Sequence, residues 1–198
     1  MMCLMACTSK QQQVCGYAFL HETTGKWGII STEGELLTTD IFAYQPTSVV
    51  NGMFSVPDKQ GNYKLYNIYS PLLPITEQSY HRIGHFFDEV TWAQETPYSP
   101  FSLIDKQGRV IVSTAQYPQY NISLVYNFSD GLSLIVTDEG KYGYMDTQGN
   151  IIIPPIYDRA TNFNENIALV GMSNATGEIG FQIINKKGRV IALSLIHI

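Results

Sequence analysis

Apolar and polar positions along the chain follow one recurring phrase. An aromatic or apolar run is followed by a polar turn that ends in glycine, and a second apolar run comes next. The phrase occurs at residues 26–37, 101–112, 141–158 and 180–192. Short apolar runs bounded by glycine-containing turns predict β-strands joined as hairpins. The pattern therefore predicts an all-β chain built from similar units.

The glycines that end these turns give the length of the unit. Gly108, Gly149 and Gly188 follow one another at intervals of about 40 residues, within the range of repeat architectures. The interval from Gly34 to Gly108 is about twice as long, so we expect a degenerate unit inside it. Residues 63–74 fill that place, with serine where the turn glycine is expected.

Each clear turn also has a polar residue at its first position. Asp105 begins the turn that ends at Gly108, and Asp146 begins the turn that ends at Gly149. A carboxylate at this position can accept hydrogen bonds from the turn backbone, and glycine at the last position can take positive φ. These residues are therefore predicted to be structural anchors.

A second phrase follows each hairpin. Tyr157 precedes Phe163 by six residues, as Tyr80 precedes Phe86, and each Phe leads into an acidic turn and a further apolar run. We therefore expect about three strands per unit, with an apolar face that only a neighbouring unit can bury.

The best copy also predicts local features of its last strand. The run Ile151–Ile153 indicates a strand buried on both faces, and Pro154 with Pro155 is expected to end its pairing. Gly143 follows an aromatic residue inside a strand, so a neighbouring backbone or ring can approach it closely.

These phrases resemble the WG-repeat family, which is named for its Trp-Gly dipeptide. The resemblance covers about residues 16–192 and rests on four segments: Trp27-Gly28, its variant Tyr142-Gly143, Ile104-Asp105 to Gly108, and Ile153-Pro154 to Tyr157-Asp158. It implies a bacterial repeat protein whose function is to interact with other molecules.

The predicted fold class is all-β, a tandem array of antiparallel hairpins or meanders, with a β-propeller as the alternative. We expect about five units, near residues 16–60, 61–100, 101–136, 137–176 and 177–192. Residues 1–15 would be a signal-peptide remnant, a lipidation site and a tether. Residues 193–198 break the pattern and resemble translated adapter sequence, so we expect a non-native tail there.

Composition and charge narrow the function classes. The chain has 12 basic and 17 acidic residues, a net charge of −5, and its densest basic group is Lys186, Lys187 and Arg189. A nucleic-acid-binding role would need a larger basic patch. The longest apolar runs, such as 151–156, are too short to span a bilayer.

The first residues resemble the end of a bacterial lipoprotein signal peptide. Leu4 to Cys7 fits the lipobox pattern, and a polar tether of residues 8–13 follows. Only six residues precede Cys7, and none is basic, so either the start was assigned too late or the sequence is a fragment. We expect Cys7 to carry a lipid that anchors the protein at the bacterial cell envelope. The alternative is an ordinary cytoplasmic N-terminus.

Residues with catalytic or metal-binding chemistry are few. His81 and His85 lie four residues apart, followed by Asp88 and Glu89, which on a helix would be a metal-ligand spacing. The segment has no helical periodicity, so we interpret these as solvated loop residues. No nucleophile elbow, catalytic triad or phosphate-binding glycine loop occurs. We therefore expect a non-catalytic protein without a cofactor or metal.

Aromatic residues suggest a contact surface. Tyr117, Tyr120 and Tyr126 cluster where the chain departs from the repeat, and tyrosine-rich surfaces suit protein or sugar partners. Packing under a long loop is an equally good interpretation. The leading hypothesis is an envelope-tethered scaffold that binds an unknown protein. The alternative is a carbohydrate-binding envelope protein that uses this surface.

Overall fold

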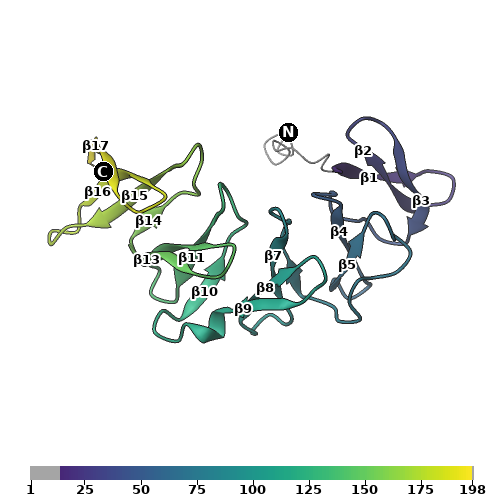
Figure 1. Cartoon of the computed structure of the whole chain (residues 1–198), viewed down its shortest axis with the longest axis horizontal. Coiled ribbons are helices and arrows are strands. Elements are labelled where there is room, and N and C mark those ends of the chain that lie inside the picture. Colours follow the sequence, from purple (N-terminus) through teal and green to yellow (C-terminus); the bar gives the residue numbers. More distant parts are fainter. Residues whose placement is uncertain (1–13, 198) are drawn as a thin grey trace. The chain divides into compact units, whose positions relative to one another are not determined.

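The computed structural model describes residues 14–197, with side chains through Leu193, as a succession of small antiparallel β-sheets (Figure 1). Within this range there is no α-helix, only a single 3₁₀ turn, η1, at Thr114–Gln116. No helix in that part of the chain is long and apolar enough to cross a membrane. The predicted all-β array of antiparallel hairpins is confirmed. Cys7 and the tether lie outside the described residues.

The sheets follow one another in chain order. The first contains β1 (Gly16–His21), β2 (Lys26–Ser31) and β3 (Leu36–Phe42), and the second contains β4 (Met53–Pro57) and β5 (Tyr63–Asn67). The third contains β6 (Arg82–Ile83), β7 (Val90–Gln94), β8 (Phe101–Asp105) and β9 (Val110–Ser113). The fourth contains β10 (Ile122–Val125), β11 (Leu132–Thr137), β12 (Tyr142–Asp146) and β13 (Ile151–Tyr157). The fifth contains β14 (Arg159–Ala160), β15 (Ile167–Ser173), β16 (Ile179–Asn185) and β17 (Val190–His197).

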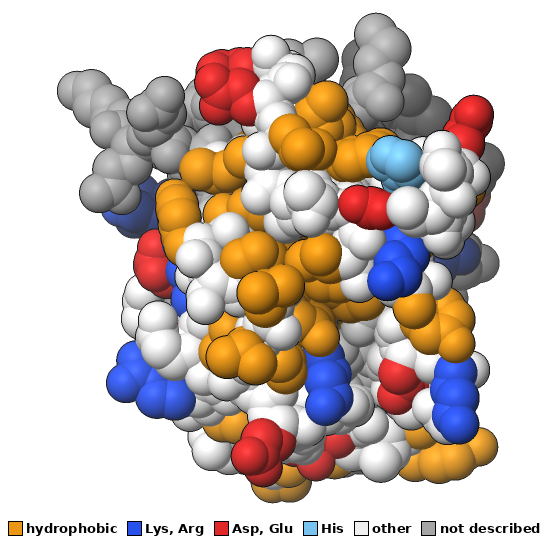
Figure 2. Space-filling model, turned by 90° about the vertical axis from the view of Figure 1, so that its right-hand side faces the viewer, with side chains coloured by type: hydrophobic (Ala, Val, Ile, Leu, Met, Phe, Trp, Pro, Cys, Tyr) orange, Lys and Arg blue, Asp and Glu red, His pale blue; other side chains and the backbone are white. Residues whose placement is uncertain are grey.

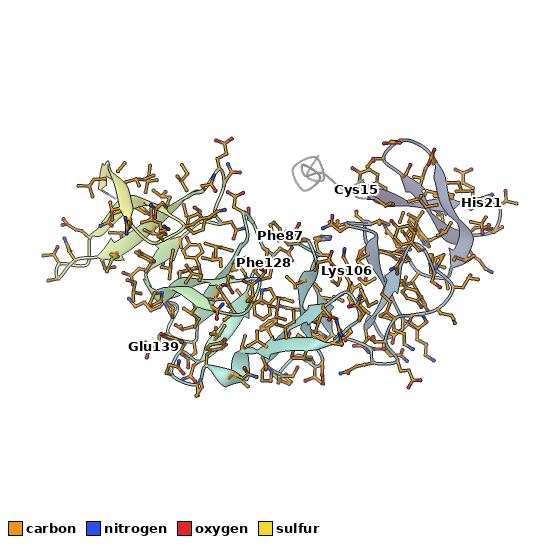
Figure 3. The ribbon with its side chains drawn as sticks, in the orientation of Figure 1. Cys15, His21, Phe87, Lys106, Phe128 and Glu139 are labelled. Atoms are coloured by element: carbon orange, nitrogen blue, oxygen red, sulfur yellow. The ribbon has the colours of Figure 1, made fainter. Side chains whose placement is uncertain are left out.

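The chain forms two compact units. The first runs up to Ser99 and includes Ile104–Arg109, and the second comprises Pro100–Leu103 and the chain from Val110 onward. In the first unit, Cys15 and His21 mark the approach to β1 and its last residue (Figure 3). Strand β17 continues through His197, which pairs with Gly180. This pairing does not test the prediction of a non-native tail.

Side chains from consecutive sheets share hydrophobic cores. In the second unit, Leu134 of β11 and Tyr144 of β12 pack in one cluster with Val170 of β15 and Ile184 of β16. All four are at most 4% exposed. In the first unit, Ile29 and Phe42 of the first sheet share a core with Phe54 and Val56 of the second. Each sheet therefore depends on its neighbour for burial, as expected for stacked repeats.

The sequence repeat and the sheet are out of phase. The hairpin phrase at residues 141–158 forms the last two strands of the fourth sheet. The connector and the apolar run after it form β14 and β15, the first two strands of the fifth sheet. The repeat thus contributes four strands rather than three, because the two-residue strand Arg159–Ala160 lies inside the Tyr157–Phe163 connector.

The prolines of β13 do not end its pairing, contrary to the sequence prediction. Tyr144 pairs with Ile153 and Tyr142 pairs with Tyr157, so three residues of β13 bulge opposite Gly143. Proline is tolerated here because β13 lies at the sheet edge, where its missing amide hydrogen breaks no ladder. The predicted two-sided burial is also wrong, since Ile152 is 40% exposed and Ile153 3% exposed.

The glycine of the Tyr-Gly dipeptide makes room for this bulge. A Cβ atom on Gly143 would lie 2.6 Å from the Pro155 nitrogen and 2.7 Å from the Ile153 carbonyl oxygen. In the first sheet, a Cβ atom on Gly28 would lie 2.6 Å from the ring of Phe19. Trp27 beside it is half-buried and packs against the core that contains Ile29. In both sheets the glycine of the dipeptide therefore leaves room for a neighbouring group to pack closely.

Candidate interaction surface

The turns between the last two strands of each sheet are built alike. The Asp146 carboxylate accepts hydrogen bonds from the backbone N–H groups of Gln148 (2.9 Å) and Asn150 (2.7 Å). Asp105 accepts the equivalent bonds from Gln107 and Arg109, each 2.9 Å. The turn glycines have positive φ, as expected: Gly34, Gly108, Gly149 and Gly188. The carboxylates of Asp105 and Asp146 therefore bind the backbone of their own turns.

Asp105 is held ionised by its own turn. Burial opposes ionisation, but hydrogen bonds from Arg109, including a 2.6 Å bond from its Nε, and from Gln107 outweigh it. The net effect lowers the pKa of Asp105. The carboxylate therefore stabilises the turn as an acceptor.

Asp158 joins elements of the fourth and fifth sheets. Its carboxylate accepts a hydrogen bond from the Lys141 ammonium and, at 2.7 Å, from the backbone N–H of Ser173 at the end of β15. These bonds lower the pKa of Asp158 to about 2. This predicted repeat anchor thus tethers β15 to the residue that precedes β12.

Tyr157 and Phe163 belong to the core between the same two sheets. Both are at most 5% exposed, and burial raises the pKa of the Tyr157 hydroxyl. The Phe163 ring packs edge-on against Tyr144, with centroids 4.7 Å apart. The Tyr144 hydroxyl donates to the Thr161 carbonyl oxygen at 2.7 Å, and burial raises its pKa as well. The sequence pattern did not single out Tyr144, the core's central ring.

The histidine segment shows ordinary loop contacts. The Thr91 hydroxyl donates to the His85 carbonyl oxygen at 3.2 Å, and Glu89 forms a 2.9 Å ion pair with Lys106. Across residues 14–197, no group of three or more His, Cys, Asp or Glu side chains is placed to hold a metal ion. In this loop His81 is half-buried and His85 is exposed.

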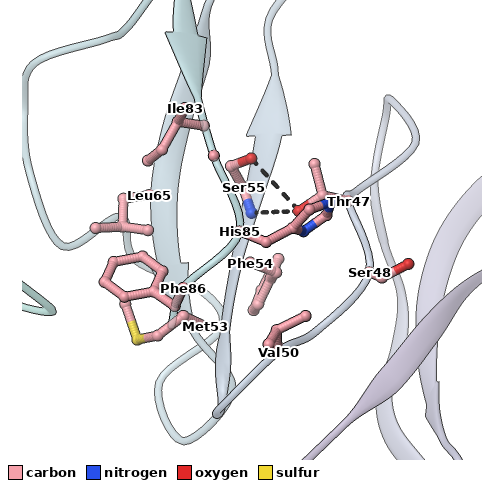
Figure 4. A pocket seen from close by; sticks show the side chains of 11 residues that line it. Thr47, Ser48, Val50, Met53, Phe54, Ser55, Leu65, Ile83, His85 and Phe86 are labelled. Atoms are coloured by element: carbon pink, nitrogen blue, oxygen red, sulfur yellow. Dashed lines mark hydrogen bonds between the residues drawn. The ribbon is translucent and has the colours of Figure 1, made fainter. Parts of the chain in front are cut away.

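A small hollow lies beside β4 (Figure 4). Its lining includes Phe54, Leu65 and Phe86, and the Thr47 hydroxyl oxygen accepts a 2.9 Å bond from the Ser55 N–H. Its volume is about 10 Å³, room for one water molecule and far below that of a small-molecule site. The hollow is therefore no ligand pocket.

The three tyrosines of the predicted contact surface differ in their environments. The Tyr117 hydroxyl donates to the Gly149 carbonyl oxygen at 2.5 Å, so this half-buried side chain anchors the segment after η1 to the β12–β13 turn. Tyr120 is half-buried, and its N–H donates to the Tyr117 carbonyl oxygen at 3.0 Å. Tyr126 is 39% exposed. The contact-surface and carbohydrate hypotheses stay predictions.

A more exposed apolar surface lies on the loop after β5. Tyr69, Leu72 and Leu73 are 76%, 76% and 71% exposed. This "apolar loop", residues 67–74, stands where the other repeats have a four-residue turn. Sequence reasoning missed it as a surface, although Ser70 in place of the turn glycine marked the departure from the repeat.

The fold and the repeated turn define a β-repeat protein. Residues 142–174 match the family model described as WG containing repeat, which supports the WG-repeat family and spans β12 to β15. No curated protein matches the chain significantly.

Two solved structures are similar to this chain at low identity. The computationally designed Ika8 protein is 12% identical over 94% of this chain, with a TM-score of 0.48. The C-terminal WD40 domain of Sif2 is 14% identical over 87% of this chain, with a TM-score of 0.41. This chain spans 60% and 52% of those two proteins, respectively.

Proposed function

We propose that this chain is a non-catalytic scaffold that binds another protein through the apolar loop. The observation that supports this function is the exposure of three large hydrophobic side chains on one short loop. Large apolar side chains gathered on a loop gain nothing for folding, and such patches mark sites of protein contact.

The loop has a fixed base and an apolar tip. The Asn67 side-chain oxygen accepts a 2.7 Å hydrogen bond from the Tyr69 N–H, and the Asn67 carbonyl oxygen accepts a 3.1 Å bond from the Ser70 N–H. The chain rejoins the sheet where the Ile75 N–H donates to the Leu65 carbonyl oxygen at 2.8 Å. Both ends are therefore held while Leu72 and Leu73 face solvent, which lowers the entropic cost of binding.

In-cell crosslinking with mass spectrometry tests this function. Crosslinks from the loop to a specific protein are expected, and the double variant Leu72→Asp, Leu73→Asp should reduce capture of that protein at least about tenfold. The control is Tyr98→Asp, since Tyr98 is 97% exposed on a different turn. Equal capture by both variants, or no loop crosslink at all, would overturn the proposal.

We also propose that the scaffold is tethered to the bacterial cell envelope through a lipid on Cys7. The support is the Leu4-to-Cys7 lipobox pattern and the polar tether after it. Expressed in a bacterium behind an intact signal peptide, the protein should sediment with membranes and incorporate a labelled fatty acid. Cys7→Ser should abolish both. Label retained by the serine variant would contradict the tether.

A further inference from the structure

The strand after each repeated turn begins with two large aliphatic residues. The turn glycine is followed by one variable residue and then by the pair Leu36-Leu37, Val110-Ile111, Ile151-Ile152 or Val190-Ile191. The second residue of the pair is 42% exposed at Ile111, 40% at Ile152 and 54% at Ile191. Ile111 and Ile152 are exposed although further sheets follow both of them along the chain. The repeat therefore keeps an aliphatic side chain at a position that faces solvent.

A β-bulge sets the second aliphatic residue outside the regular ladder. Met145 pairs with Ile151 and Tyr144 with Ile153, so Ile152 is the extra residue of β13. The same shift in β17 leaves Ile191 as the extra residue between the paired positions on either side of it. Bulges of this kind occur at sheet edges, where they redirect a side chain. The exposure of these aliphatic residues thus follows from a repeated backbone feature.

Within the second unit, each turn packs against the edge strand of the sheet before it. A Cβ atom on Gly149 would lie 2.6 Å from Val112 of β9, and one on Gly188 would lie 3.5 Å from Ile153 of β13. Exposed aliphatic residues and turns therefore alternate along one surface of this unit. We call this surface the rim, and it comprises Ile111, Asn150, Ile152, Lys187, Arg189 and Ile191.

The rim is basic, although the chain as a whole has a net charge of −5. The turn at residues 185–189 holds three basic residues and no acidic one, and Lys187 and Arg189 are exposed. In the turn at residues 146–150, the Asp146 carboxylate accepts hydrogen bonds from the N–H groups of its own turn. The rim therefore combines positive charge with aliphatic side chains, which complements a surface that is anionic outside and apolar beneath.

The first sheet has the aliphatic residues of this pattern without the positive charge. Its turn carries Glu33 and Glu35 at the positions of Lys187 and Arg189, and Leu36 after it is 59% exposed. Figure 2 shows the side of the molecule where β1–β3 are drawn, with hydrophobic side chains among side chains of both charges. The first sheet therefore supplies a matched control within the same chain.

We propose that the rim docks on the surface of an anionic lipid membrane. Exposed aliphatic side chains can enter the boundary between head groups and acyl chains, while Lys and Arg attract anionic head groups. Protein-binding hot spots are instead enriched in Trp, Tyr and Arg and poor in aliphatic residues such as Leu and Val. Docking of the rim depends neither on the apolar loop nor on a lipid at Cys7.

Co-sedimentation of the full chain, produced without lipid, with vesicles tests this docking. Vesicles of phosphatidylglycerol and phosphatidylcholine in equal parts should bind the protein at least about tenfold more tightly than vesicles of phosphatidylcholine alone. Salt near 1 M, where the screening length is about 3 Å, should weaken this binding.

Charge reversal at the rim tests the electrostatic part. Lys187→Glu with Arg189→Glu gives the fifth-sheet turn the charges that the first-sheet turn already carries, so the variant should fold. It should weaken binding to the anionic vesicles at least about tenfold. The control is Lys26→Glu with Lys59→Glu, two exposed residues of the first unit, which changes the net charge equally. The control should bind like the wild-type protein.

Substitution of the aliphatic residues tests the apolar part. Ile111→Thr with Ile152→Thr keeps the β-branched shape that suits a strand but removes apolar surface, and should weaken vesicle binding at least about threefold. Leu36→Thr is the control and should leave binding unchanged. Circular dichroism checks that each variant folds.

Three results would overturn the proposal. The first is no preference for anionic vesicles, and the second is an equal loss in the rim variants and their controls. The third is a loss caused only by Leu72→Asp with Leu73→Asp, which would assign the membrane contact to the apolar loop. A protein crosslinked to Lys187 in cells, without vesicle binding, would instead make the rim a protein-binding surface.

Discussion

At the scale of single residues, turn glycines have two structural roles. Gly149 has φ of +88°, and a Cβ atom on it would lie 2.6 Å from the Val112 side chain of β9. Gly188 lies against Ile153 of β13, and Gly108 against Thr76. Gly108, Gly149 and Gly188 therefore both permit the left-handed turn and let the turn pack against the preceding repeat, whereas a Cβ atom on Gly34 would meet nothing within 4 Å.

Gly149→Ala should destabilise the protein by about 1–3 kcal/mol, from left-handed strain together with the clash with Val112. Gly140→Ala is the matched control, since Gly140 also has positive φ (+76°) but a Cβ there would meet nothing within 4 Å. Urea denaturation should show the larger loss for Gly149→Ala, and Val112→Ala in that background should recover part of it. Equal losses for the two glycine variants would refute the seating role.

Residue patterns predicted the conformation of the turns better than the pairing and burial of the strands. The Asp-x-x-Gly signal works because the backbone conformation at Gly108 and Gly149 is decided locally. The prediction at Pro154 and Pro155 was wrong, because an edge position and the bulge opposite Gly143 are set by tertiary pairing. Exposure of Leu72 and Leu73 was missed for a related reason: apolar residues indicate burial unless the neighbours are known.

At the scale of elements, ionic contacts tie sheets whose cores already meet. Asp158 lies between β13 and β14, Lys141 just before β12, and Ser173 at the end of β15. The contact therefore links the third strand of one sheet to the second strand of the next, across the boundary where β13 gives way to β14.

This contact predicts an acid sensitivity. The folded-state pKa of Asp158 is about 2, below the ordinary value of 3.8, so the carboxylate stabilises the fold above pH 3.8 and loses that effect as pH falls through 2. Asp158→Asn should flatten the dependence of unfolding free energy on pH in this window, and Lys141→Met should do the same. Chemical denaturation at several pH values measures it. An unchanged slope in Asp158→Asn would exclude the linkage.

At the scale of the whole molecule, the sequence predicted the repeat array. It did not predict where each sheet begins relative to the sequence repeat. The intervals between glycines revealed repetition, and Ser70 marked the degenerate unit. Which strands share a sheet depends on pairing between β11 and β12, across a turn that ends at Gly140 and that the hairpin phrase of residues 141–158 does not include.

The offset between repeat and sheet bears on how such a chain can be shortened or lengthened. A fragment that begins at Tyr142, where the family match starts, would sever β12 from β11 and leave half a sheet. A break after Tyr157 keeps both neighbouring sheets whole. Duplication of one sequence unit, by contrast, supplies the last two strands of one sheet and the first two strands of the next. Gene segments of this length can therefore be gained or lost while every hairpin keeps a partner.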